Sequence, residues 1–200
     1  CGVLTTKGGT AAIIEYFGPG TASISATGKG TITNMGAEVG ATTSLFPFDE
    51  RMGRYLKATK RSQVAELAEK HQAELNPDPE VFKNPERFFD RVIEIDLSKL
   101  EPHITGPRRS DAARPVSQRA KDVEKGGFPP NIKAALIGSC TNSSYEDIER
   151  AAAVARQARA AGLKSKVYFL ITPGSDQIHN TIERDGQLKD LEAIGATVLA

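Results

Sequence analysis

The chain has 200 residues, of which 39% are hydrophobic and 26% are charged. These values are close to those of soluble globular proteins, so they exclude a fibrous or an intrinsically disordered chain. The 26 lysines and arginines nearly balance the 25 aspartates and glutamates, giving a formal charge of +1, so no overall field recruits nucleic acid or an anionic membrane. We therefore expect one large or two small folded domains that hold any charged ligand through local groups.

The apolar runs, the N-terminus and the cysteines indicate in which cellular compartment the protein is found. No apolar run approaches the roughly 18 residues that a membrane-spanning helix needs. The sequence begins with Cys1-Gly2 rather than with methionine, so we expect a soluble fragment or processed product. Cys1 and Cys140 are too few for a disulfide framework, which favours a reducing compartment such as the cytosol or the mitochondrial matrix.

The first hundred residues combine glycine-rich stretches with short amphipathic segments. Asp49-Glu50 suits a helix N-terminus because acidic side chains complement its positive dipole, and apolar residues at helical spacing follow Ser62. In chain order, the expected elements are a helix or strand over 10–16, a helical segment over 23–40, helices over 49–56 and 62–75, and a strand over 93–97.

Residues 101–131 contain five prolines and little periodicity, which is typical of an interdomain connection. We therefore expect a domain boundary near the start of this segment. The elements expected after it are strands over 132–137, 167–171 and 196–199, helices over 145–161 and 176–184, and a short helix through Leu188 and Leu191. This alternation predicts an α/β domain with a parallel, doubly wound sheet.

The turn over 138–144 lies between the first of these strands and its helix, where ligands bind in open parallel sheets. Ser144 and Asp147 have the spacing of a capping box, so the helix N-terminus follows Cys140 closely. A thiolate is stabilised at such a helix end. Cys140 is thus a candidate ligand or nucleophile, with a buried free cysteine as the open alternative.

Few other residues suggest chemistry. Asn34 and Glu38 are four apart, so on one helix they would share a face and could reach one site together, although such a pair is also common on an exposed face. Residues 28–31 superficially resemble a phosphate-binding loop, but the required earlier glycine is missing. His71 lies on an apolar helix stripe, which favours a core histidine, and no two histidines are spaced for a zinc site.

Residues 134–147 closely resemble the first cysteine signature of the aconitase family, and of its mitochondrial type in particular. The resemblance covers essentially the whole chain, through motifs that occur in the order of the family. These motifs are 7–10, 15–20, 34–38, 40–44, 100–104 and 171–175. The resemblance implies an α/β fold with parts of two consecutive domains: 1–101 as the C-terminal part of a second domain, and 102–200 as a linker and the N-terminal half of a third.

The resemblance also implies a function. It implies that the protein is an enzyme, a [4Fe-4S] hydro-lyase that interconverts citrate and isocitrate through cis-aconitate. One iron of such a cluster lacks a protein thiolate and binds the substrate as a Lewis acid. Cys140 would be the first of three cluster ligands. Asn34 matches the active-site asparagine of the family, which lies close to the cluster. Glu38 matches the active-site glutamate, which lies near the water or hydroxyl on the open iron. Substrate-binding residues are not assigned.

In the family, the other two ligands form a Cys-x-x-Cys shortly after the segment that corresponds to the end of this chain. We therefore expect them beyond Ala200, and we expect the chain to be inactive without the rest of its parent protein. The expected partner is a small tricarboxylate, with neither a membrane nor nucleic acid. The expected location is the mitochondrial matrix in a eukaryote, or the cytoplasm in a bacterium.

Three alternatives stay open at this point. A homoaconitase would act on homocitrate and homoaconitate, which are one carbon longer. A noncatalytic relative would bind RNA, although the near-neutral charge gives this little support. A thiol-dependent enzyme would use Cys140 without iron.

Overall fold

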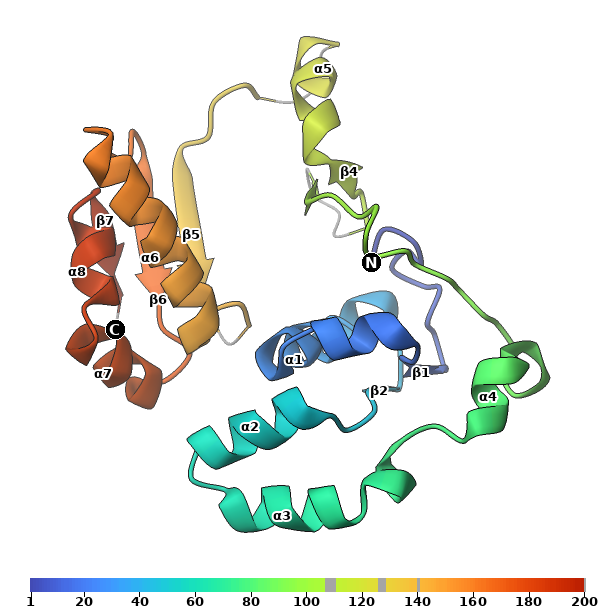
Figure 1. Ribbon diagram of the computed structural model, residues 1–200. Coiled ribbons are helices and arrows are strands. Elements are labelled where there is room, and N and C mark those ends of the chain that lie inside the picture. Colours follow the sequence, from blue (N-terminus) through green and yellow to red (C-terminus); the bar gives the residue numbers. More distant parts are fainter. Residues whose placement is uncertain (107–110, 126–128, 140, 200) are drawn as a thin grey trace. The chain divides into compact units, whose positions relative to one another are not determined.

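The computed structural model describes residues 1–106, 111–125, 129–139 and 141–199. The chain folds as two compact units, Cys1–Gly126 and Gly127–Ala200 (Figure 1). The division falls within the proline-containing segment, and the assignment of 1–101 and 102–200 to two domains of a complete protein stays a prediction. In the part of the chain that the structure describes, no helix is both long and apolar enough to cross a membrane.

The first unit begins with two short parallel strands, β1 (Ile13–Glu15) and β2 (Thr43–Leu45), which resolves the choice over 10–16 in favour of a strand. Three helical segments connect them: η1 (Pro19–Ser23), α1 (Ala26–Asn34) and η2 (Ala37–Val39). The expected helical segment over 23–40 is therefore divided. Its main part, α1, starts where the Ser25 hydroxyl accepts a hydrogen bond from the Gly28 amide.

Helices α2 (Glu50–Ala58) and α3 (Ser62–Lys70) lie side by side (Figure 1). Asp49 caps α2, as the acidic pair predicts, and Ala65 of α3 is fully buried. The predicted helix over 62–75 ends early because His71 leaves helical geometry, with φ −106° and ψ 25°. The following segments are η3 (Gln72–Leu75), α4 (Pro79–Lys83) and η4 (Pro85–Arg87).

The predicted strand over 93–97 is wrong. These residues lie in an irregular segment, and the side chains of Ile93, Ile95 and Leu97 are 39–52% exposed. Alternation describes a strand with one buried face, but the strand also needs a neighbour to complete its backbone hydrogen bonds. The next segment is more ordered than its sequence suggests, with β3 (His103–Ile104), β4 (Arg114–Pro115), η5 (Val116–Gln118) and α5 (Arg119–Glu124).

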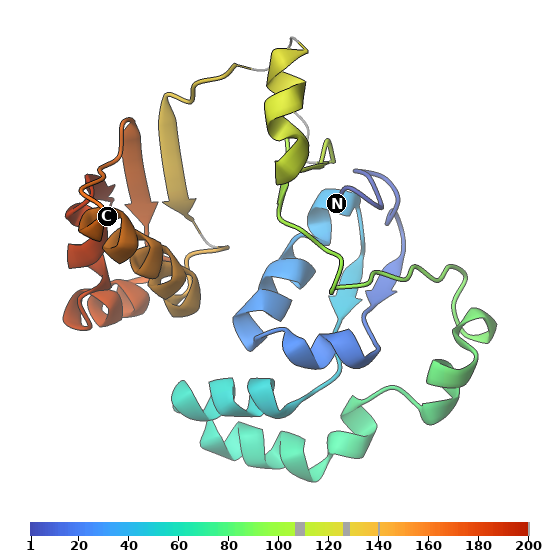
Figure 2. The ribbon, with the colours of Figure 1, turned by 45° about the horizontal axis from the view of Figure 1, so that its top comes forward.

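The second unit has the predicted strand-helix alternation around a three-stranded parallel sheet in the order β5-β6-β7. Figure 2 shows β5 and β6 running in the same direction. The elements are β5 (Ala134–Gly138), α6 (Tyr145–Ala160), β6 (Tyr168–Thr172), α7 (Asp176–Arg184), α8 (Gln187–Glu192) and β7 (Ala196–Val198). The parallel α/β prediction is confirmed.

The core of this unit lies between one face of the sheet and the three helices, which contact one another. Ile171 at the centre of β6 is fully buried, as are Ile148 of α6 and Ile182 of α7. On the opposite face, Leu136 of β5 is 58% exposed and Tyr168 of β6 is 80% exposed. Among the described residues of this unit, helices therefore cover one face of the sheet, whereas parallel sheets are usually covered on both faces.

This asymmetry predicts different costs for two truncations in the same sheet. We expect Ile171→Ala to lower the free energy of unfolding by about 2–5 kcal/mol, because it leaves a cavity in the core. We expect Leu136→Ala to cost about 0.5 kcal/mol, because its side chain is already largely in water. Urea denaturation of the 200-residue chain, followed by circular dichroism, measures both. Equal costs for the two variants would contradict the placement of the core.

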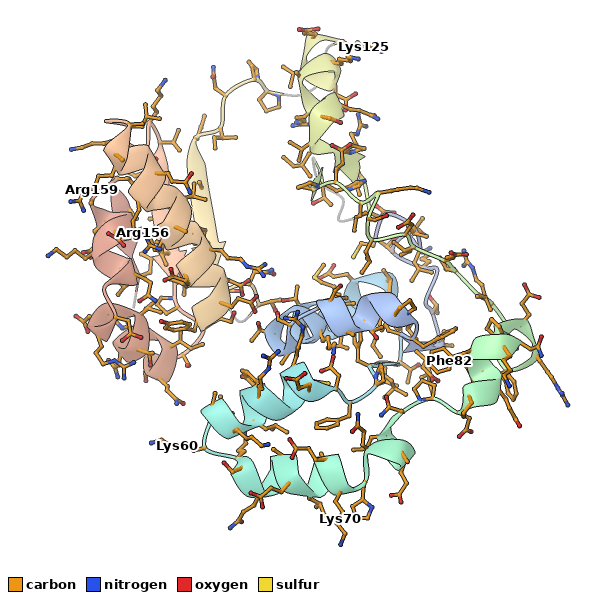
Figure 3. The ribbon with its side chains drawn as sticks, viewed as in Figure 1. Lys60, Lys70, Phe82, Lys125, Arg156 and Arg159 are labelled. Atoms are coloured by element: carbon orange, nitrogen blue, oxygen red, sulfur yellow. The ribbon has the colours of Figure 1, made fainter. Side chains whose placement is uncertain are left out.

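Two arginines of α6 form ion pairs with an aspartate of α8. Figure 3 labels Arg156 and Arg159 on α6. Arg156 donates to Asp190 of α8 at 2.8 Å and to Glu149 of its own helix at 2.6 Å, while Arg159 lies 3.9 Å from Asp190. The Arg156 guanidinium lowers the pKa of Glu149, so this carboxylate stays charged into more acidic solution.

Candidate functional site

Asn34 is the last residue of α1 and lines a pocket of about 330 Å³ in the first unit. The side chains around this pocket are small, and most are polar. Besides Asn34, the lining residues are Thr33, Gly36, Ala37, Ala41, Thr42, Thr43 and Ser44. Such a surface can bind a small ligand that is rich in oxygen atoms, because hydroxyl and amide groups donate and accept hydrogen bonds.

Glu38 does not share a helix with Asn34, so the prediction that the two lie on one helix face is wrong. Helix α1 ends at Asn34, and Glu38 belongs to η2, which Gly40 ends with a positive φ of 82°. The α-helical hydrogen-bond pattern stops between the two residues, because the Gly36 amide donates to the carbonyl of Thr33, three residues back, at 3.0 Å. Both residues are exposed, but Asn34 lines the pocket and Glu38 does not.

The loop that carries Glu38 is held by backbone hydrogen bonds. The Ala41 amide donates to Gly36 at 3.0 Å, and the Thr42 amide donates to Ala12, just before β1, at 2.8 Å. The Gly9 amide donates to Val39 at 2.9 Å. These bonds join the pocket wall to the segments that flank the parallel β1–β2 pair.

Lys29, in the sequence that superficially resembles a phosphate-binding loop, is not available to a phosphate. It lies within α1, is 3% exposed and forms an ion pair with Asp49. The other carboxylate oxygen of Asp49 accepts from the Met52 amide at 3.0 Å and so caps α2. The ammonium of Lys29 also lies 5.9 Å from the centre of the Phe46 ring. This arrangement is consistent with the sequence-based rejection of a phosphate loop.

Phe46 belongs to a small aromatic cluster beneath the ion pair. Its ring stacks on that of Tyr16 with 4.4 Å between ring centres. Burial raises the pKa of Tyr16, because the charged phenolate would lose its hydration. The Lys29 ammonium therefore lies over one ring of a stacked aromatic pair.

Cys140, the predicted metal ligand, lies outside the described residues, so the structure does not test its role. The neighbouring residues place its loop at the carboxyl end of β5. Ser139 and Asn142 have positive φ values of 65° and 63°, a conformation uncommon for residues other than glycine. Ser143 is 1% exposed, and its hydroxyl donates to the Ser139 carbonyl.

The loop leads directly into α6 and contacts the turn after β6. Ser144 and Asp147 form the predicted capping box, which begins α6. The Gly174 amide donates to the Ser143 carbonyl at 3.2 Å, so two neighbouring strands present their loops together. Ser175, in the turn after β6, caps α7 by accepting from the Ile178 amide at 3.2 Å.

The described residues contain no group of three or more His, Cys, Asp or Glu side chains that could hold a metal ion. His71 is not the core histidine that its apolar stripe predicts. It ends α3 with a side chain that is 43% exposed, and its Nδ1 lies 2.9 Å from Glu74. His103 pairs with the Glu101 carbonyl at 2.7 Å. The site candidates therefore remain those of the two loops.

The fold and these loops define a parallel α/β protein with polar loops at the carboxyl end of its strands, the place where such proteins bind ligands. The sequence profile of the aconitase family (aconitate hydratase) matches residues 1–200. The chain belongs to the aconitase family.

Its curated relatives include proteins named mitochondrial aconitate hydratase. The chain is 57% identical to that of Emericella nidulans, 56% to that of Aspergillus fumigatus and 54% to that of Gracilaria gracilis, each over 199 residues. These alignments cover 100% of this chain but only 24–25% of the relatives. The chain thus spans about a quarter of the length of the relatives that it matches.

Two features of the first unit were not found from the sequence. The Lys29–Asp49 pair joins residues 20 positions apart, and no local pattern signals such a contact. Ser44 lines the Asn34 pocket from β2, although it follows two threonines in an unremarkable polar run. Only the parallel pairing of β1 with β2 brings Ser44 to this place.

Proposed function

We propose that this chain is part of a [4Fe-4S] hydro-lyase that interconverts citrate and isocitrate through cis-aconitate. The observation that carries the proposal is the match to the aconitase family over all 200 residues, together with relatives of 54–57% identity that are named aconitate hydratase. Homoaconitase and RNA-binding alternatives have no observation in their favour. We propose the mitochondrial matrix as the location in a eukaryote and the cytoplasm in a bacterium.

The residues of this chain fit one ligand position of such a cluster. In the sequence, Cys140 comes two residues after the end of β5 and four residues before Ser144, which caps α6, and a thiolate is favoured near such a helix N-terminus. Cys1, the other cysteine, lies in the first unit and is exposed. We propose Cys140 as one of three ligands, with the other two in the parent protein beyond Ala200. When bound, the cluster supplies a Lewis-acidic iron that eases departure of the substrate hydroxyl.

Two residues of the first unit have proposed roles near the reaction. The Asn34 amide, at the wall of the pocket, would donate and accept hydrogen bonds with the tricarboxylate close to the cluster. The Glu38 carboxylate would accept a hydrogen bond from the water that leaves or enters. Glu38 does not line the Asn34 pocket, so this role places it outside that pocket, next to the loop that forms its wall.

The proposal predicts that the 200-residue chain alone neither holds a cluster nor turns over substrate, because it supplies one ligand of three. Ferrous iron and sulfide are added to the chain without oxygen, and the visible spectrum and the conversion of citrate are recorded. We expect neither stable iron–sulfur absorption after desalting nor hydratase activity. A stable cluster together with hydratase activity would overturn the requirement for the parent protein.

A further inference from the structure

The hydroxyl of Ser44 is a buried polar group without a partner. Its Oγ is shielded from solvent, and within the described residues it has no hydrogen bond. Ser44 lies on β2 between two exposed neighbours, Thr43 and Leu45, and lines the same pocket as Asn34. The other such oxygen found in the described residues, Oε1 of Gln187, is in the second unit and does not line the Asn34 pocket.

A buried hydroxyl that bonds to nothing destabilises the fold, and buried polar groups in proteins are almost always paired. The neighbouring hydroxyl of Thr33 shows the usual solution, since it bonds to the carbonyls of Lys29 and Gly30 in its own helix. Ser44 lies in a strand, where no carbonyl of a preceding helical turn is available to its side chain. The partner of its hydroxyl is therefore to be sought in the pocket that it lines.

The position of Gly36 shows how closely Ser44 approaches the Asn34 loop. A Cβ placed on Gly36 would lie 2.6 Å from the Ser44 Oγ and 2.9 Å from the Thr33 carbonyl, closer than real Cβ atoms approach other atoms. Because Gly36 has no side chain, the Ser44 hydroxyl has room at this place. Gly36 lies between Asn34 and Glu38 in the sequence. The hydroxyl oxygen thus lies against the loop that joins Asn34 to Glu38, and its hydrogen can rotate about the Cβ–Oγ bond.

We propose that Ser44 is a substrate-binding residue, whose Oγ–H donates a hydrogen bond to a carboxylate oxygen of the acid held in the Asn34 pocket. This inference rests on the proposed function, because it takes the ligand to be a tricarboxylate. A carboxylate oxygen suits the position because it accepts several hydrogen bonds, and those with a charged partner are stronger than neutral ones. Asn34 and Ser44 then hold the ligand from α1 and β2, respectively.

The test is Ser44→Ala in the complete, cluster-containing protein, which removes one oxygen and adds no bulk. We expect KM for citrate to rise about tenfold, the equivalent of about 1.4 kcal/mol, with kcat changed less than twofold. We also expect the Kd of propane-1,2,3-tricarboxylate, which has no hydroxyl to eliminate, to rise by a similar factor in calorimetry. Ser23→Ala is the matched control, because that exposed hydroxyl bonds only to the Gly20 carbonyl.

The two readouts separate this inference from the proposed function. Absence of citrate turnover in the unsubstituted protein would count against the function, while the calorimetric comparison would still test Ser44. An unchanged Kd and KM in Ser44→Ala would overturn the inference. So would a fall in melting temperature of several degrees with unchanged binding, because that is the signature of a structural hydroxyl.

Discussion

Replacement of Cys140 by serine in the complete protein is expected to abolish the iron–sulfur absorption and to lower hydratase activity about 10³-fold. A serine hydroxyl does not ionise at neutral pH, so it cannot replace a thiolate ligand. Loss of Lewis-acid catalysis of about 4 kcal/mol corresponds to this factor, at 1.36 kcal/mol for each tenfold change. Iron content, the visible spectrum and the rate of citrate conversion measure the effect.

Cys1→Ser is the control for this experiment, because Cys1 is an exposed free cysteine of the first unit. We expect it to change neither iron content nor activity. Full cluster occupancy in the Cys140→Ser protein would remove Cys140 from the ligand set. Loss of activity with an intact cluster would instead favour the thiol-dependent enzyme.

The second large effect concerns the ion pair between Lys29 and Asp49 in the first unit. Lys29→Met is expected to lower the free energy of unfolding of the chain by about 3 kcal/mol, because it leaves Asp49 without its counterion in a partly buried position. The value is at the low end for buried pairs, since the Asp49 side chain is 21% exposed and also bonds to the Met52 amide. Urea denaturation followed by circular dichroism measures this change in the free energy of unfolding.

A double variant distinguishes a lost ion pair from a general packing defect. Asp49→Asn combined with Lys29→Met removes both charges, while asparagine still caps α2. We expect the double variant to recover most of the lost stability, because a buried ion pair replaced by neutral groups of similar size is often energetically neutral. A double variant as unstable as Lys29→Met alone would show that the ammonium group acts through packing instead.

Local signals were sufficient for the second unit. The capping box of Ser144 and Asp147 and the apolar runs of β5 and β6 lie within a few residues of the structure that they specify. Parallel pairing then follows from the alternation of strands and helices, because each crossover returns the chain in the same direction. This is why the sequence alone predicted every helix and strand of this unit, within a few residues at the ends.

The first unit was harder to predict because its structure depends on distant contacts. The alternation over 93–97 looks like a strand, yet pairing with another strand is not encoded in those five residues. The spacing of Asn34 and Glu38 fits one helix face, but α1 ends at Asn34 and Glu38 belongs to the separate helical segment η2. Lys29 with Asp49 and Ser44 with the Asn34 pocket are brought together only by tertiary structure.

The central claim is that this chain belongs to a hydro-lyase for citrate and isocitrate, and turnover by the complete protein tests it most directly. The protein is purified without oxygen, and citrate, isocitrate and homocitrate are followed separately by nuclear magnetic resonance. We predict interconversion of citrate and isocitrate with cis-aconitate released in small amounts, and loss of this activity when a chelator removes the iron. Turnover of homocitrate alone, or a folded protein that converts none of the three acids, would contradict the account.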